Sequence, residues 1–258
     1  MCNECGCGMS YAPTSRTARA ATPAATPSHE TVVAVRESLF GANEAVAAQN
    51  RATFRTHGVL ALNLMSSPGT GKTYLLETLI PLLARIPLRC AVVVGDLETD
   101  NDAQRIARTG AHAIQITTGQ ACHLDATMVA DVLPQLDLAA LDILFIENVG
   151  NLVCPASFDL GEARRIALLS VCEGDDKPAK YPTLFHKADL MLITKADLLP
   201  YLPQFEPARS EACLRALANH SPCLTISSMQ PETLAPLVDW LVREHAALKQ
   251  PAHAWKAV

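Results

Sequence analysis

The sequence has few charged residues and no surplus of basic ones. Lys, Arg, Asp and Glu make up 18% of the 258 residues, and the net charge is −5. A protein that binds nucleic acid through its phosphates needs a basic surface, which this composition does not supply. We therefore expect no nucleic-acid partner, and look instead to nucleotides, metals and other proteins.

The chain also lacks long apolar runs and an apolar leader. Hydrophobic residues make up 49% of it, which excludes a disordered chain, but each apolar run is broken well before membrane-spanning length. The first eight residues, Met-Cys-Asn-Glu-Cys-Gly-Cys-Gly, have neither the basic nor the apolar region of a secretory signal. These absences predict a cytoplasmic protein without a membrane partner.

Nine cysteines need an explanation in such a reducing compartment, where clustered thiols usually bind metal or take part in catalysis. Cys2, Cys5 and Cys7 form Cys-x-x-Cys-Gly-Cys, and the glycines let three thiolates converge on one soft metal ion. A redox Cys-x-x-Cys is the alternative. The βαβ pattern that surrounds thioredoxin-like motifs is absent here, which favours metal binding.

The composition divides the chain into two parts. Residues 10–28 are mostly Ala, Thr, Pro and Ser, and such a segment buries too little apolar surface to offset its ordering entropy. We therefore predict a flexible metal-binding tail and linker at residues 1–30 and one domain at residues 31–258. Apolar residues at helical spacing in residues 31–54 predict one or two amphipathic helices before the core.

Short apolar runs then alternate with helical patterns. The runs expected to be strands are 59–65, 90–95, 113–117, 143–146, 190–194 and 223–227, with 166–171 as a further candidate, and helices are expected at 73–83, 124–133, 211–218 and 232–248. Residues 173–182 form a polar excursion. This alternation predicts an α/β fold with a mostly parallel sheet flanked by helices.

Residues 66–73 read Ser-Ser-Pro-Gly-Thr-Gly-Lys-Thr and lie between a predicted strand and a predicted helix, the context of a phosphate-binding loop, or P-loop. Lys72 is expected to reach the β- and γ-phosphates, and the Thr73 hydroxyl to bind Mg²⁺. The residues expected around the nucleotide phosphates are Pro68, Gly69, Thr70, Gly71, Lys72 and Thr73. A chance glycine-rich turn is the alternative, and Ser66 stands where the first glycine is usual.

Two strands end in acidic residues. Glu147 closes the apolar run Leu144–Ile146 and suits the metal shell, and Gly150 follows it where a backbone N–H could meet the γ-phosphate. Asp96, after residues 90–95, is expected to coordinate Mg²⁺ or to orient the attacking water. Lys72, Asp96 and Glu147 are the predicted catalytic residues. The alternative for either acid is an ordinary solvated residue at a strand end.

The segment Thr194-Lys195-Ala196-Asp197 is similar to the Asn-Lys-x-Asp guanine motif of GTPases. A carboxylate at Asp197 accepts hydrogen bonds from guanine N1–H and N2, whereas adenine presents an acceptor at N1. Lys195 and Asp197 are therefore expected to bind the base, with Ser227 closing over it. Thr194 replaces the usual Asn, and its hydroxyl is expected to donate to guanine N7.

Cys122 and His123 are adjacent after a predicted strand end, and Cys154 lies four residues beyond Gly150. They are candidate metal ligands, although a lone cysteine is more often a small core residue. The remaining cysteines lie within apolar segments and are expected to be core residues: Cys90, Cys172, Cys213 and Cys223.

Taken together, these segments resemble the HypB family, the GTPases that help insert nickel into hydrogenases. The similarity includes Cys-x-x-Cys-Gly-Cys, the P-loop, Gly-Asp-Leu-Glu-Thr-Asp-Asn-Asp-Ala, Cys-His-Leu-Asp-Ala and Ile-Glu-Asn-Val-Gly-Asn-Leu-Val-Cys-Pro. The resemblance implies a nickel site at Cys2, Cys5 and Cys7, and a nickel or zinc site between two subunits at Cys122, His123 and Cys154. It further implies hydrolysis of GTP to GDP, a homodimer promoted by GTP, a HypA-type zinc metallochaperone as partner, and the large-subunit precursor of [NiFe]-hydrogenase as target.

Three other functions compete with this interpretation. The related GTPase for urease assembly would share the P-loop, but the tail thiols and the segment 146–155 favour the hydrogenase branch. A P-loop small-molecule kinase would use Asp96 to bind an acceptor hydroxyl, and the guanine motif argues against it. A metal-regulated scaffold that binds GTP without turnover is the third.

Overall fold

A computed structural model describes residues 29–249, with side chains from residue 40 onward. The helices are α1 (His29–His57), α2 (Lys72–Leu83), α3 (Asn101–Ala107), α4 (Ala126–Val132), α5 (Lys177–Lys180), α6 (Pro182–His186), α7 (Pro207–Ala216) and α8 (Ala235–Leu248). The strands are β1 (Leu60–Ser66), β2 (Cys90–Asp96), β3 (His112–Thr117), β4 (Ile143–Glu147), β5 (Arg164–Ser170), β6 (Leu190–Thr194) and β7 (Cys223–Thr225). Within residues 29–249, no helix has the length and apolarity to cross a membrane.

The seven strands form one parallel sheet in the order β3-β2-β4-β1-β5-β6-β7. β1 lies in the middle, with β4 on one side and β5 on the other. Because all strands run the same way, the loops after β1, β2, β4 and β6 leave the sheet at one edge. The P-loop, Asp96, Glu147 and Thr194 therefore meet at that edge.

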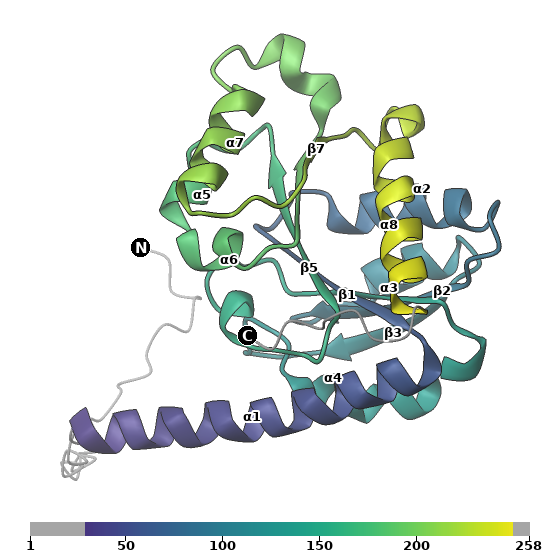
Figure 1. The fold of residues 1–258 in the computed structure, drawn as a ribbon, viewed down its shortest axis with the longest axis vertical. Coiled ribbons are helices and arrows are strands. Elements are labelled where there is room, and N and C mark those ends of the chain that lie inside the picture. The colour runs from purple at the N-terminus through teal and green to yellow at the C-terminus, as the bar shows by residue number, and fades with distance from the viewer. Residues whose placement is uncertain (1–28, 250–258) are drawn as a thin grey trace, which may run out of the picture.

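Side chains that alternate along β1 supply the core on both faces of the sheet. Leu60, Leu62 and Leu64 pack with α2 and α8 on one face. Ala61 packs with α1 and α4 on the opposite face, and Met65 packs on a third cluster with α6 and α7. Figure 1 shows α1 and α4 along one side of the sheet and α2, α3 and α8 along the other. The predicted α/β fold is confirmed.

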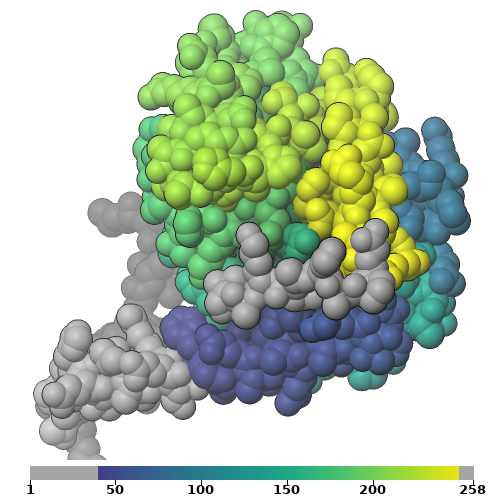
Figure 2. Space-filling view, viewed as in Figure 1, coloured from purple at the N-terminus to yellow at the C-terminus, as the bar shows by residue number. Residues whose placement is uncertain are grey.

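Helix α1 is one continuous helix, where the sequence allowed one or two. Two buried amides tie it to the domain: Asn50 donates to Ala126 O and Leu160 O, and Asn43 donates to Asp159 O. At Gly161, whose φ is +89°, a Cβ would lie 2.5 Å from Ala47 O, so only glycine lets α1 approach this closely. The space-filling view shows α1 as the lower border of the molecule (Figure 2).

The sequence-based boundaries hold for most elements. The candidate strand at 166–171 is confirmed as β5, and the polar excursion contains the short helix α5. Helix α3 was not predicted, because Asn101–Ala107 is a polar, seven-residue segment with only Ala103 and Ile106 buried. The tail, with Cys2, Cys5 and Cys7, and most of the predicted linker lie outside the described residues.

Candidate nucleotide and metal sites

The P-loop is wrapped around the start of α2. Gly69 and Gly71 have φ of +73° and +100°, which side-chain-bearing residues rarely adopt, and Lys72 begins the helix. The Lys72 ammonium is buried and donates to the Ser66 hydroxyl at 3.0 Å. Burial lowers the pKa of Lys72, and the nearby Glu147 carboxylate opposes that shift. The geometry is that of an anion site formed by backbone N–H groups and a lysine.

Glu173 holds the same loop from outside, and the sequence did not single it out. Its carboxylate accepts hydrogen bonds from Ser67 Oγ at 2.6 Å and from Thr70 Oγ1 at 2.9 Å. It also accepts from Ser170 N at 3.2 Å and forms an ion pair with Lys177 at 3.4 Å. Glu173 lies in the polar segment 173–182, and nothing in the sequence except its acidic side chain marked it as a possible site residue.

Thr73 and Glu147 are brought together at the start of α2 and the end of β4. Thr73 Oγ1 donates to Glu147 Oε1 at 2.8 Å, while Glu147 Oε2 is buried without a hydrogen-bond partner among the described residues. Burial raises the pKa of Glu147 to about 7, against the opposing charge of Lys72. A hydroxyl beside a carboxylate with a free oxygen fits the oxygen ligands that Mg²⁺ prefers.

Asp96 lies at the same edge, at the end of β2. Its two carboxylate oxygens accept from Leu97 N and from Thr99 Oγ1 at 2.9 Å. Its charge acts on Lys72, which places it near the P-loop, but no direct bond joins it to Thr73.

Gly150 packs directly on the P-loop. A Cβ on Gly150 would lie 2.8 Å from Pro68 Cα and 2.9 Å from Pro68 N. Because both are backbone atoms, a side chain at position 150 would have to displace the loop. The segment after β4 and the P-loop are therefore in direct contact at Gly150 and Pro68.

The predicted base-binding residues cluster at the ends of β6 and β7. Ser227 Oγ donates to Asp197 Oδ1, and Lys195, with φ of +60°, donates from Nζ to Gly69 O at 2.7 Å. Thr194 Oγ1 donates to Thr70 O at 2.8 Å. The Thr194 hydroxyl thus supports the P-loop rather than facing a base, contrary to its predicted role at guanine N7.

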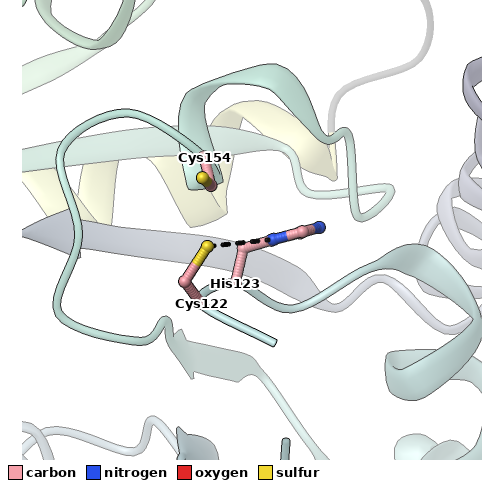
Figure 3. A group of neighbouring side chains, drawn as sticks. All are labelled: Cys122, His123 and Cys154. Atoms are coloured by element: carbon pink, nitrogen blue, oxygen red, sulfur yellow. Dashed lines mark hydrogen bonds between the residues drawn. The ribbon is translucent and has the colours of Figure 1, made fainter. Parts of the chain in front are cut away.

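Figure 3 shows Cys122 and His123 on one loop and Cys154 approaching from another. The ligand atoms of the three residues lie within 4.8 Å of one another, and Cys122 Sγ is 3.8 Å from His123 Nδ1. Tetrahedral zinc, with metal–ligand bonds of 2.0 to 2.3 Å, needs ligands roughly 3.5 to 4 Å apart, so a small contraction closes the trio on a metal. The pKa of the Cys154 thiol is raised by its hydrogen bond with Cys122 and by burial.

The His123 ring is held by an aromatic stack that the sequence did not reveal. His123 stacks on Phe158 with centroids 3.9 Å apart, and Phe158 contacts Phe40 of α1 at 5.2 Å. Burial lowers the pKa of His123, which favours the neutral imidazole that binds metals.

Most of the other cysteines agree with a role in packing. Burial raises the pKa of Cys90 to about 12 and of Cys223 to about 11, so neither thiol is reactive. Cys213 is half-buried. The prediction for Cys172 was wrong, because its side chain is exposed just beyond the end of β5, where the apolar pattern had already stopped.

Comparison with known proteins agrees with this geometry. A model of the CobW/HypB/UreG nucleotide-binding domain matches residues 60–224. The hydrogenase maturation factor HypB of Escherichia coli K12 is 49% identical over 221 residues, which cover 85% of this chain and 75% of that protein. This chain belongs to the HypB family. The family resemblance predicted from the motifs is confirmed, and with it a nucleotide-binding hydrogenase maturation factor.

Two solved HypB structures share the fold. HypB from Helicobacter pylori in complex with nickel aligns with a TM-score of 0.76 and 40% identity, over 83% of this chain and 99% of that one. HypB from Archaeoglobus fulgidus aligns with a TM-score of 0.73 and 33% identity, over 80% of this chain and 99% of that one.

Proposed function

We propose that this chain is a cytoplasmic GTPase that inserts nickel into the large-subunit precursor of [NiFe]-hydrogenase. The observation that carries the proposal is the run from Glu147, the last residue of β4, to Cys154. Glu147 contacts Thr73, Gly150 packs on Pro68, and Cys154 lies beside Cys122 and His123. One short stretch of chain therefore contacts both the P-loop and the candidate metal ligands.

The nucleotide roles follow from the contacts at the sheet edge. Backbone N–H groups from Pro68 to Thr73 bind the phosphates, and Lys72 exchanges its bond with Ser66 for the β- and γ-oxygens. Thr73, with Asp96 and Glu147 nearby, would hold Mg²⁺, which supplies charge neutralisation at the γ-phosphate. Asp197, positioned by Ser227, selects guanine, and Lys195 contributes to binding the base.

Metal handling is assigned to two sites. Cys122, His123 and Cys154 bind nickel or zinc, and three ligands per chain leave a coordination position for a second subunit or an incoming protein. Cys2, Cys5 and Cys7, outside the described residues, form a separate nickel site. The relative named HypB from Helicobacter pylori in complex with nickel supports nickel as cargo.

Four residues span at most about 14 Å, so closure of Gly150 on a γ-phosphate moves or tethers the Cys154 thiol. We assign the homodimer to the GTP state, in which two trios come together, and metal release to hydrolysis. A HypA-type zinc metallochaperone is the partner. Urease is an alternative target, since a relative 40% identical over 227 residues is named hydrogenase/urease maturation factor HypB.

Phosphate release under multiple turnover tests the enzymatic part. We expect GTP but not ATP to be hydrolysed, slowly, at about 10⁻⁴ to 10⁻² per second, because the P-loop carries no arginine. The same reaction with small hydroxyl compounds should yield only inorganic phosphate. Phosphorylated acceptor would establish the kinase alternative, and GTP binding without turnover would establish the scaffold.

A further inference from the structure

The metal loop, which carries Cys122 and His123, is connected to the nucleotide edge, the end of the sheet where the P-loop, Asp96 and Glu147 lie. This connection is separate from the one that runs along the chain from Gly150 to Cys154. It starts at Asn148, the residue after β4, which is 1% exposed. Its backbone N–H donates to Leu64 O of β1 at 3.1 Å, so the residue is fixed to the central strand.

The Asn148 side chain joins three segments. Its Oδ1 accepts from Leu124 N at 3.1 Å and from Val149 N at 3.0 Å, and its Nδ2 donates to Asn63 Oδ1 at 3.2 Å. Leu124 directly follows His123. One amide side chain thus connects the backbone of the loop that carries Cys122 and His123 to the end of β4.

The side chain of Leu124 holds the same loop against β2. A Cβ on Gly95 would lie 2.7 Å from Leu124 Cγ, so Leu124, which is fully buried, covers the residue before Asp96. Leu124 is therefore held at two points, its backbone N–H and its side chain. Its N–H donates to Asn148, the residue after Glu147, and its side chain rests on Gly95, the residue before Asp96.

We propose that Asn148 is a positioning residue, which, together with the Leu124 contact on Gly95, transmits the nucleotide state to Cys122 and His123. The proposal rests on the proposed function. When Glu147 and Gly150 respond to the γ-phosphate, Asn148 lies between them and moves with them. Its bond to Leu124 N then carries the displacement to the metal loop, so that all three ligands shift together instead of Cys154 alone.

The test uses the full chain with Cys2→Ser, Cys5→Ser and Cys7→Ser, so that only the Cys122 trio binds metal. Zn²⁺ and Ni²⁺ are titrated with GDP and with a non-hydrolysable GTP analogue, and the ratio of the two metal dissociation constants is recorded. In Asn148→Ala we expect this ratio to move at least threefold toward one. Linkage requires the effect of metal on nucleotide affinity to fall by the same factor.

Asn43→Ala is the matched control, because Asn43 is also buried and also binds the backbone near this loop, accepting from Ala126 N at 2.9 Å. Its partners are Ala126 at the start of α4 and the Asp159 carbonyl before β5, and neither follows a strand that carries the P-loop, Asp96 or Glu147. It should change metal affinity equally in both nucleotide states. If Asn148→Ala loses its native circular dichroism, Leu124→Ala tests the clamp from the other side and should lower the ratio as well.

A purely structural role of Asn148 would weaken metal binding alike with both nucleotides. An unchanged ratio in the folded variants, or equal affinities in the parent, would overturn the inference while leaving GTP hydrolysis intact. Absence of GTP hydrolysis in the unsubstituted chain would instead overturn the proposed function.

Discussion

The P-loop and the metal trio lie at the same end of the sheet, but their surroundings differ. Thr70, Lys72, Thr73 and Glu147 are at most 7% exposed. Hydrogen bonds join Thr70 to Glu173 and Thr194, and Thr73 to Glu147. Cys122, His123 and Cys154 are all half-exposed and lie on two loops without regular structure. The nucleotide residues are preorganised by the core, whereas the metal residues depend on how two loops are held.

This difference has a functional meaning. A buried site held by hydrogen bonds selects its ligand by fixed geometry. A half-exposed site with three ligands accepts a fourth from outside and can be tightened or loosened at small cost. The contrast predicts that substitutions at the nucleotide edge act on specificity and stability, while the loops determine metal exchange.

The largest expected effect concerns base recognition. In Asp197→Asn the amide cannot accept from guanine N1–H and N2 as the carboxylate does, but it matches xanthine. We expect GTP affinity to fall roughly 100-fold and xanthosine triphosphate affinity to rise by a similar factor, given about 1 to 3 kcal/mol for each unsatisfied buried group. Equilibrium titration with fluorescent analogues of both nucleotides measures this. Unchanged GTP affinity would remove Asp197 from the site.

A second expectation concerns the buried Glu147 carboxyl, whose pKa is raised to about 7 from an ordinary 4.5. Below pH 4.5 the folded and unfolded chains are both protonated there. As the pH rises to 7 only the unfolded chain loses the proton, so stability falls and the loss is complete above pH 7. Glu147→Gln should therefore stabilise the nucleotide-free protein at pH 8 by on the order of 1 to 3 kcal/mol, and by little near pH 4.5.

Urea unfolding at pH 5 and pH 8 measures the Glu147→Gln effect, with Glu98→Gln as the control because Glu98 is exposed. The control should show no pH-dependent gain. The same Glu147→Gln protein should lose Mg²⁺-dependent hydrolysis. A variant less stable than the parent at pH 8 would show that the carboxylate is favourably paired in the nucleotide-free protein.

The smallest of the three effects concerns the contact of β4 with the P-loop. Gly150→Ala places a Cβ within 3 Å of Pro68 backbone atoms, so the loop must shift, and we expect GTP affinity to fall about tenfold. Gly41→Ala is the control, since nothing lies within 4 Å of its Cβ and it should preserve affinity while adding about 0.5 to 1 kcal/mol of helix stability. Equal affinities in both variants would mean that the two loops are not mechanically joined.

Sequence patterns predicted the strands and the position of the P-loop well, because buried parallel strands are continuous apolar runs and the P-loop needs glycine at two left-handed positions. They did not predict the residues that brace the site. Glu173 and Phe158 belong to no motif, and Asn148 lies in a family motif that does not reveal its contacts. The partners lie 103 residues apart for Glu173 and Thr70, and 24 residues apart for Asn148 and Leu124. Only the folded arrangement makes these contacts visible.

For Thr194 the sequence did predict a role, but it assigned the hydroxyl to a different partner from the one in the structure. Its position in a guanine-like motif suggested contact with the base, yet its hydroxyl is 2.8 Å from the Thr70 carbonyl. The motif indicated the correct region of the fold, but not which neighbouring group the hydroxyl binds. Sequence spacing carries no such information.

Ser66, at the position where P-loops usually begin with glycine, bears on nucleotide exchange. Without a bound nucleotide, the buried Lys72 ammonium is shielded from water, where an unpaired charge is costly. The Ser66 hydroxyl, 3.0 Å from Lys72 Nζ, gives that charge a resting partner until the next phosphate arrives. The nucleotide-free P-loop therefore keeps its lysine paired, and we expect one nucleotide to replace another without unfolding of the loop.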